Sequence, residues 1–462
     1  MLAPNLRLEN LSAALARSLQ LPRARNPIFG LEDTVLLIKR SWTALLFCFI
    51  AVGCNQLEID AADRDEKLAS AIASFVDFEW QGEVFTTNCF RPEKAIDDQV
   101  LYTVGQLNGH DSVGRLDQLQ IKNVEAVDTP GGCNITYSAR MPVAWGKRTV
   151  PESYELILPQ DVGYRAVEEF VSRYTADCVD WHAHDVTSGV FWYYFRPLNH
   201  ACALADEDIF RVPAKVIPSA EETEGKYPEY HKVWEDNTLN VVAIFGKAKD
   251  EPTISDVGVR GYGNFVKAMR DELDGAEMAM EPTDGSENPG EEQPVTTIRA
   301  TLADGKRVVV HAFLIQSVSA APNSFWETYE TLTPDADFIV YNGHSGLGQN
   351  VKKLARRGEW RAGQYSIVFM NGCDTYAYID SALADAHAAV NPDDPEGTKY
   401  MDIVANAMPS YFRSMPEATM AIVRGLLSYD DPMTYEEILK NIDSSEVALV
   451  AGEHDNVYTP GM

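Results

Sequence analysis

Positive charge is scarce in this chain. Its 462 residues include 39 Lys and Arg against 69 Asp and Glu, so the formal net charge is -30. Nucleic acids and anionic membranes attract proteins mainly through cationic side chains, and this balance argues against both as electrostatically held partners. A strongly acidic composition is instead typical of a protein that stays soluble in a salty or exposed compartment.

Long apolar runs are also missing near the N-terminus. The run from Trp42 to Val52 is too short to span a bilayer as a helix. It follows Lys39 and Arg40 and ends in small residues before Cys54. This pattern resembles the signal of a bacterial lipoprotein, in which the cysteine becomes the lipid-bearing N-terminus after cleavage.

The resemblance implies that residues 1–54 are a signal peptide and that Cys54 is the lipid attachment site. We expect an exported protein in the bacterial cell envelope, at the outer membrane, whose membrane contact is made by the lipid alone. Because 38 residues precede Lys39, more than such a signal needs, we expect the true start near Val35 or Leu36. The alternative is a buried helix that contains a cysteine by chance.

Cysteine is also sparse, with seven residues in the whole chain. Cys48 lies in the run that would be removed, and Cys373 is left without an expected partner. An even set in the first half suits two disulfides in an exported domain, with three pairings open: Cys89, Cys133, Cys178 and Cys202. Cys373 is therefore a reactive group or an intermolecular crosslinker, and its position after a strand favours the former.

Composition divides the chain after Cys54 into further parts. Residues 55–67 are polar and acidic, which indicates a tether. Residues 68–235 mix strand and helix patterns, which predicts a smaller α+β domain that carries the disulfides. Residues 218–238 are polar and contain Pro, and we expect a linker there. From 239 to 462, apolar strands alternate with helices, which predicts an α/β domain.

Local patterns predict several elements in these domains. Phe191 to Phe195 is a dense aromatic run and predicts a strand. Residues 274–294 are acidic and rich in Gly and Pro, and they predict a surface loop. Asp304-Gly305 between two apolar runs predicts a β-hairpin, and Thr434 with Glu437 predicts a capping box at the start of a helix.

Motifs for cofactors are missing. The glycines at Gly261 and Gly263 lack the third glycine of a dinucleotide-binding turn. His182 and His184 have a spacing that suits a metal ion, but no second pair of ligands stands near them in the sequence. We therefore expect neither a metal nor a cofactor.

One stretch, residues 336–380, combines strand patterns with reactive side chains. Phe338 to Tyr341 and Ser366 to Met370 are short apolar runs of the kind buried in parallel sheets. Each is followed by Asn-Gly and then by a reactive residue, His344 or Cys373. The segment between them predicts a crossover helix capped by Asn350. Two parallel neighbours joined in this way bring both reactive groups to one edge of the sheet.

A cysteine beside a histidine suits nucleophilic catalysis, because the histidine accepts the thiol proton and later protonates the leaving amine. Gly343 and Gly372 permit tight turns and close approach of a substrate backbone. The amides of Cys373 and of the Ser345-Gly346 turn are candidate donors to the oxyanion of a tetrahedral intermediate. Asp374 also shapes this site, because a carboxylate next to the cysteine raises the pKa of the thiol unless a cation offsets it.

These residues resemble the motifs of caspase-like cysteine peptidases, the group that contains caspases, gingipains, separases and legumains. The matching segments are an apolar strand before Asn-Gly-His344 and a second one before Asn-Gly-Cys373. The resemblance implies a mostly parallel sheet with flanking helices, hydrolysis of protein or peptide substrates by a His344/Cys373 dyad, and no cofactor. Calcium acts in some members, but nothing in this sequence supports a calcium site. One departure is Ser345, where the family usually has glycine.

Two alternatives remain open at this point. The first is a caspase-like fold that binds or scaffolds partners without catalysis. The second is an adhesion lipoprotein in which the disulfide-bearing first half does the work. A cluster of cations between the two strands either faces solvent or binds acidic substrate side chains: Lys352, Lys353, Arg356, Arg357 and Arg361.

Overall fold

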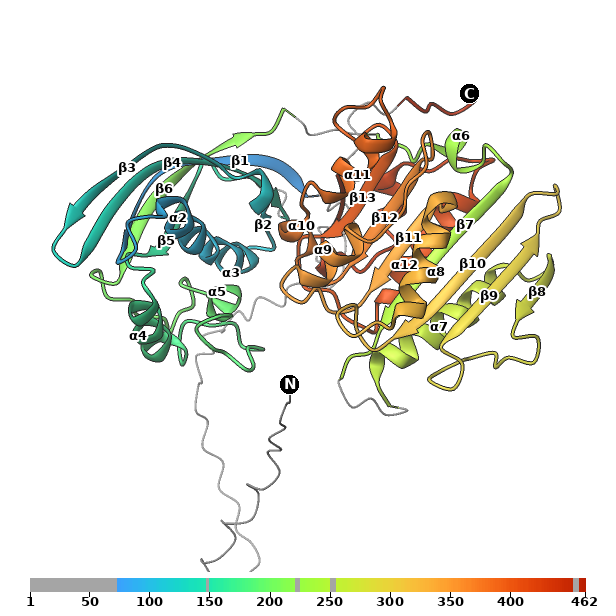
Figure 1. Ribbon diagram of the computed structural model, residues 1–462, viewed down its shortest axis with the longest axis horizontal. Helices are drawn as coiled ribbons and strands as arrows, with labels where there is room; N and C mark the ends of the chain where they lie inside the picture. Colours follow the sequence, from blue (N-terminus) through green and yellow to red (C-terminus); the bar gives the residue numbers. More distant parts are fainter. Residues whose placement is uncertain (1–72, 147–148, 221–224, 250–254, 452–456) are drawn as a thin grey trace, which may run out of the picture. The chain divides into compact units, whose positions relative to one another are not determined.

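The computed structural model describes residues 73–146, 149–220, 225–249, 255–451 and 457–462. The expected signal peptide, the lipid attachment site at Cys54 and the tether lie outside these residues. The described residues belong to one compact unit, Ile59–Met462. They form a mixed α/β structure with a smaller and a larger sheet (Figure 1).

The smaller sheet is antiparallel throughout. Its strand order is β2-β4-β1-β6-β5, and β3 pairs with β4 further along the edge that β2 also uses. The strands are β1 (Ser74–Thr86), β2 (Val113–Gly114), β3 (Gln120–Thr129), β4 (Gly132–Trp145), β5 (Ser153–Pro159) and β6 (Ile209–Pro218). The helices of this half are α2 (Pro92–Val100), α3 (Tyr102–Asn108), η1 (Leu116–Gln118), α4 (Tyr164–Tyr174) and α5 (Phe191–Tyr194).

The predicted aromatic strand at Phe191 to Phe195 is wrong, because Phe191–Tyr194 form the short helix α5 and Phe195 is its C-cap. Phe191 and Phe195 are four residues apart, which puts them on one side of a helical turn. Both rings pack against Tyr102, with centroids 6.3 Å and 5.5 Å from the Tyr102 ring. Burial among aromatic neighbours thus outweighs the strand preference of the residues.

The larger sheet is mixed, with eight strands in the order β14-β13-β12-β11-β7-β10-β9-β8. The five strands from β13 to β10 pair in parallel, and β14, β9 and β8 pair antiparallel at the edges. The strands are β7 (Thr238–Gly246), β8 (Glu277–Glu281), β9 (Val295–Thr301), β10 (Arg307–Ile315), β11 (Phe338–Asn342), β12 (Ser366–Asn371), β13 (Met401–Asn406) and β14 (Ala448–Ala451).

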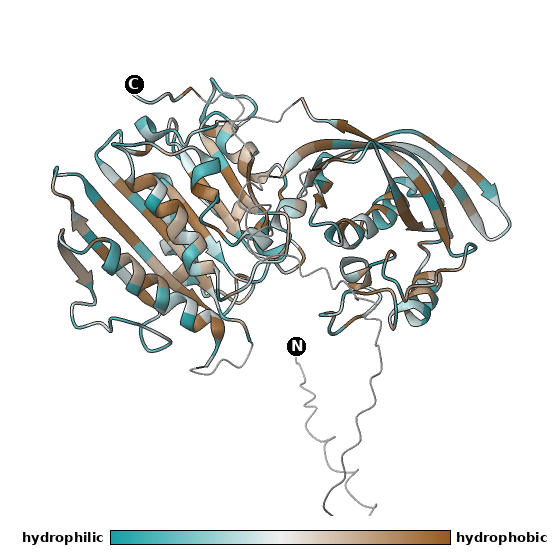
Figure 2. Cartoon of the chain, turned by 180° about the vertical axis from the view of Figure 1, so that it is seen from behind, coloured by the Kyte–Doolittle hydropathy of each residue, from teal (hydrophilic) through white to brown (hydrophobic). Residues whose placement is uncertain are grey.

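Helices cover both faces of the larger sheet, and the central strands are accordingly apolar along their length (Figure 2). Val241 and Ala243 share a buried cluster with α7 and α12, whereas Val242 and Ile244 share one with α8 and α9. The helices are α6 (Tyr230–Val233), α7 (Val257–Glu272), α8 (Asn323–Leu332), η2 (Thr333–Asp335), α9 (Gln349–Ala355), α10 (Thr375–Tyr378), α11 (Ala382–Val390), α12 (Met415–Leu427), α13 (Tyr435–Leu439) and η3 (Ser444–Glu446).

Several local predictions for this half are confirmed. Strands β9 and β10 form the expected hairpin, with Gly305 at a φ of 90° in its turn. Thr434 and Glu437 form the expected capping box at the start of α13. Strands β11 and β12 are parallel neighbours joined through α9. Among the described residues, no helix has the length and apolar character needed to cross a membrane.

Three expectations are wrong. Residues 274–294 contain β8, which is held by pairing with β9. Residues 225–238 of the expected linker 218–238 are part of the fold, because they contain α6 and the buried Lys226, whose ammonium lies 2.5 Å from Asp402. The N-cap of α9 is Gly348, with a φ of 88°, and Asn350 instead lies in the first turn. In each case a partner distant in sequence or a backbone constraint decides the conformation.

Candidate functional site

The ends of β11 and β12 bring His344 and Cys373 to one cavity of about 1220 Å³. Asn342 pairs with Asn371 at the last step of the two strands. The Gly343 amide then donates to the Asn371 carbonyl at 3.1 Å. The two reactive residues therefore lie at the same edge of the sheet, as predicted, and both line one cavity.

Glycine is required where the two loops touch. A Cβ added at Gly372 would lie 2.7 Å from the Gly343 carbonyl oxygen and 3.3 Å from the Ser345 nitrogen. A Cβ added at Gly343 would lie 2.6 Å from the Tyr341 hydroxyl oxygen. The absence of a side chain at Gly372 thus allows the cysteine loop to pack against the backbone of the histidine loop, whereas glycine at position 343 leaves room for the Tyr341 ring.

A buried row of asparagines at the ends of β11, β12 and β13 supports these loops. Asn371 donates to Asn342 at 2.8 Å, and Asn406 at the end of β13 donates to Asn371 at 2.8 Å. The hydroxyls of Ser410 and Thr419 donate to the same Asn371 and Asn342 oxygens. Sequence reasoning noticed the repeated Asn-Gly but attributed it to the glycines alone. The repetition at matching strand ends was the signal for this row.

His344 is held by its backbone and by its ring. Its carbonyl accepts hydrogen bonds from the Tyr341 hydroxyl at 2.9 Å and from the side-chain amide of Asn350 at 2.7 Å. Its Nε2 lies 3.1 Å from the Ala248 carbonyl, and its ring packs edge-on against Phe412. With a proton on Nε2 donated to Ala248, Nδ1 is the ring nitrogen with a free lone pair.

The turn after His344 contains consecutive residues with positive φ. Gly346 and Leu347 have φ values of 59° and 50°, and Ser345 is buried. Among the described groups, no hydrogen-bond acceptor receives the Ser345 amide or the Cys373 amide. Backbone amides without an acceptor beside a nucleophile are the type of donor that stabilises an oxyanion.

The surroundings of Cys373 disfavour its thiolate. The side chain is half-buried, and its sulfur lies 3.7 Å from the Ser410 carbonyl. Burial raises the pKa of Cys373 to about 12, and the neighbouring Asp374 contributes to the rise. The thiolate therefore has to be generated by proton transfer, since it is not present at rest near neutral pH.

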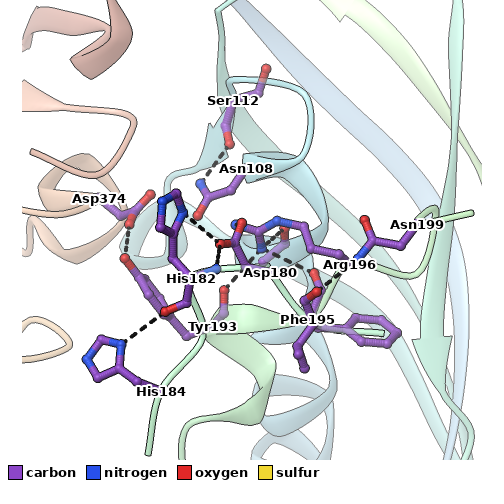
Figure 3. Close-up of polar contacts among 12 residues, drawn as sticks. Asn108, Ser112, Asp180, His182, His184, Tyr193, Phe195, Arg196, Asn199 and Asp374 are labelled. Atoms are coloured by element: carbon purple, nitrogen blue, oxygen red, sulfur yellow. Dashed lines mark hydrogen bonds and ion pairs between the residues drawn. The ribbon is translucent and has the colours of Figure 1, made fainter. Parts of the chain in front are cut away.

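Asp374 is buried and has a φ of 52°, a left-handed conformation that Asp adopts more readily than most residues. The Tyr193 hydroxyl donates to its carboxylate at 2.7 Å (Figure 3). Burial raises the pKa of Asp374 to about 6, although Tyr193, Asn108 and Arg196 oppose the rise. Asp374 is thus mostly ionised at neutral pH and adds negative charge beside the thiol.

The half of the chain before residue 220 supplies another wall of the cavity. Asp180, His182, His184 and Arg196 line it together with Tyr193 (Figure 3). Arg196 lies 3.1 Å from Asp180, and the amide of His182 donates to the same carboxylate. Sequence reasoning missed this wall, apart from the two histidines, because nothing in the local pattern links these residues to Cys373.

Cys178 and Cys202 are joined by a disulfide, with their Cα atoms 4.7 Å apart, and they flank the segment that forms this wall. Cys89 and Cys133 are free thiols in the structure. Of the three pairings left open by the sequence, the observed bond is compatible with one only. The described residues contain no group of three or more His, Cys, Asp or Glu arranged to hold a metal.

The cationic cluster has partners outside the cavity. Arg356 and Arg357 pair with Asp380 and Glu330, and Lys353 donates to the Val318 carbonyl at 3.2 Å. None of the five cluster residues is among those that line the cavity. They therefore do not offset the charge of Asp374 directly.

Comparison with protein-family profiles, with curated proteins and with solved structures finds nothing that matches this chain.

Proposed function

We propose that this protein is a caspase-like cysteine peptidase that hydrolyses peptide bonds with a His344/Cys373 dyad. The observation that carries the proposal is the shared cavity, which both residues reach from the carboxyl ends of two adjacent parallel strands. Five neighbouring parallel strands with helices on both faces also support a caspase-like sheet in residues 239–462.

The proposed reaction begins with transfer of the Cys373 proton to His344. Nδ1 is suited to this role, because Nε2 is directed at the Ala248 carbonyl and fixes the ring. The sulfur then attacks the scissile carbonyl carbon, and the carbonyl π electrons move to the oxygen. The amides of Cys373, Ser345 and Gly346 are the donors that would stabilise this oxyanion.

The intermediate then collapses with loss of the amine, which takes the proton held by His344. The resulting thioester is hydrolysed by water, whose proton passes to His344 as its oxygen attacks. The second collapse releases the carboxyl product and returns the proton to the sulfur. No external oxidant, reductant or metal is needed in this sequence of steps.

A second candidate is a caspase-like protein that binds peptides without cleaving them. The high pKa of Cys373 favours it, because burial and Asp374 both oppose formation of the thiolate. The same cavity and the same loops would then serve recognition alone. The two candidates differ in chemistry and not in fold, so a chemical experiment separates them.

The experiment treats the protein with a peptide that carries a thiol-reactive group, followed by peptide mapping. We expect stoichiometric labelling at Cys373, and a decrease in its rate of about 100-fold or more in His344→Ala, because the general base is lost. Cleavage of a mixed peptide library, followed by mass spectrometry, should fail in the same variant and in Cys373→Ala.

His200→Ala is the matched control, because His200 is exposed and does not line the cavity. Its labelling rate should equal that of the parent protein. Equal labelling of His344→Ala and the parent, together with intact library peptides, would exclude the peptidase and support the binding protein.

The proposal extends to location, where it rests on sequence. We infer export to the bacterial cell envelope and anchoring through a lipid on Cys54, with protein or peptide substrates met outside the cytoplasm. The disulfide between Cys178 and Cys202 supports this inference, because structural disulfides persist in oxidising compartments. It also supports a disulfide-bearing α+β character for the first half.

A further inference from the structure

Two further cysteines lie on adjacent segments at one end of the smaller sheet. Cys133 is the second residue of β4, and its pairing partner is Thr86, the last residue of β1. Cys89 follows Thr86 by three residues. The register of two long antiparallel strands therefore fixes the position of one cysteine against the turn that carries the other.

The backbone at this point is built for close approach. Gly132 precedes Cys133, and a Cβ at Gly132 would lie 2.3 Å from the Thr86 carbonyl oxygen. The Cys133 sulfur itself lies 3.8 Å from that oxygen. Only glycine at position 132 lets the start of β4 pack so tightly against the end of β1.

The turn after β1 then brings Cys89 back toward β4. The Asn88 amide donates to the Thr86 hydroxyl at 3.2 Å, and the Phe90 amide donates to the Asn88 side chain at 3.3 Å. Cys89 packs against the same buried cluster that contains Cys133. Burial raises the pKa of Cys133 to about 11, and the neighbouring Cys89 side chain contributes to the rise.

We propose that Cys89 and Cys133 form a second disulfide in the mature protein. Their two S–H bonds are broken and one S–S bond is formed, with two protons released and two electrons passed to the disulfide of an exchange partner. That partner is a dithiol–disulfide oxidoreductase or a small-molecule disulfide, which leaves as its reduced form.

The surroundings suit an exchange in which the partner first forms a mixed disulfide with Cys89 and is then displaced by Cys133. Cys89 is half-buried next to Phe90, whose side chain is 96% exposed, so the turn is open to an exchange partner. Cys133 is fully buried and is placed to displace the partner from Cys89. The proposal does not depend on the peptidase activity, and it leaves Cys373 as the only free thiol among the described cysteines.

The test uses the full chain purified without reductant and equilibrated with a mixture of oxidised and reduced glutathione. The protein is denatured in iodoacetamide, digested without reduction and analysed by mass spectrometry. We expect a linked peptide pair that contains Cys89 and Cys133, about 2 Da lighter than the sum of the free peptides because two hydrogens are lost. Cys178 and Cys202 should be linked to each other, and Cys373 should be alkylated.

Cys89→Ser and Cys133→Ser are the paired variants, each of which should leave the other cysteine alkylated. Cys373→Ser is the control and should retain both links. Alkylation of Cys89 and Cys133 in a sample whose Cys178–Cys202 link is intact would overturn the proposal, as would a link from either of them to Cys178 or Cys202. The result for the parent chain decides the question even if a variant does not fold.

Discussion

Cys373 and Asp374 are neighbours in the chain, and the charge of Asp374 makes the Cys373 thiol harder to ionise. Burial is the main reason that the pKa of Cys373 rises to about 12 and that of Asp374 to about 6. Asp374 titrates first, so above pH 6 its negative charge opposes the thiolate. A positive φ at Asp374 turns its carboxyl group toward Tyr193, and Asn tolerates the same backbone conformation.

The first prediction concerns this charge. Asp374→Asn should lower the pKa of Cys373 below about 12, because a like charge is removed from beside the thiolate. At a fixed pH between 7 and 10, alkylation by iodoacetamide should accelerate about tenfold for each unit of that decrease. Below about pH 5 the parent and the variant should react alike, because Asp374 is then protonated in the parent.

Asp385→Asn provides the control, since Asp385 is exposed on α11 and does not line the cavity. Its alkylation profile should match that of the parent at every pH. An Asp374→Asn protein that reacts no faster than the parent at pH 8 would show that Asp374 does not restrain the thiol.

At the scale of elements, the site depends on contact between the loops after β11 and β12. The contact is made by backbone atoms, so it cannot be adjusted by a change of rotamer. Helix α9, which connects the two strands, contributes Asn350 as a second support for the histidine loop. The geometry of the dyad is therefore a property of the strand–helix–strand unit.

Gly372→Ala should disrupt this unit. Its Cβ would lie 2.7 Å from the Gly343 carbonyl oxygen, so the loops must separate. We expect a loss of about 1–3 kcal/mol in the free energy of unfolding, as for overpacking elsewhere, and a decrease of about tenfold or more in labelling of Cys373 by the peptide probe. Urea denaturation and labelling kinetics measure the two effects.

Gly261→Ala is the matched substitution on α7, where the nearest atom to the new Cβ is 3.6 Å away. It should raise stability by about 0.5–1 kcal/mol, because alanine is the better helix former. If Gly372→Ala labelled as fast as Gly261→Ala, close contact between the loops would not be needed for the reactivity of Cys373.

At the scale of the whole molecule, one hydrogen bond joins the disulfide-bearing segment to the cysteine loop. Tyr193 and Asp374 are 181 residues apart in sequence and 2.7 Å apart at their oxygens. The ring of Tyr376, just after Asp374, also packs against Phe75 of β1 and lies under Arg115. The first half therefore contributes to the electrostatics of the site as well as to its wall.

Tyr193→Phe should destabilise the protein by about 1–3 kcal/mol at pH 8, because a buried carboxylate loses its donor. Asn108 and Arg196 still favour the ionised carboxylate in this variant, so the loss is confined to the Tyr193 hydrogen bond. Since the Tyr193 hydrogen bond lowers the pKa of Asp374, the variant should raise that pKa above about 6.

The pH dependence has a defined sign. The folded-state pKa of Asp374 exceeds its ordinary value of 3.8, so the protonated form of Asp374 stabilises the fold relative to the ionised form. This contribution to stability is lost as the pH rises through about 6. Tyr193→Phe enlarges this cost, and the difference between variant and parent should be greater at pH 8 than at pH 5 in urea denaturation. Tyr164→Phe, on an exposed tyrosine, should change neither value, and equal losses at both pH values would contradict the proposed role of Asp374.

The sequence alone determined the strands β11 and β12, their parallel pairing and the convergence of His344 and Cys373. The reason is physical: continuous apolar runs are buried on both faces of a sheet, and a short crossover helix leaves adjacent strands parallel. The hairpin at Gly305 and the capping box at Thr434 were predictable for another reason, since each depends on residues close together in the chain.

Only the tertiary structure decided which distant groups complete the site. The Ala248 carbonyl at His344, Tyr193 at Asp374 and the pairing of Cys178 with Cys202 are contacts between segments whose approach depends on packing of the whole chain. The aromatic run at Phe191 became a helix for the same reason, because its rings are buried against Tyr102. Local periodicity encodes which residues are buried, but the identity of their neighbours is set by how the buried faces pack together.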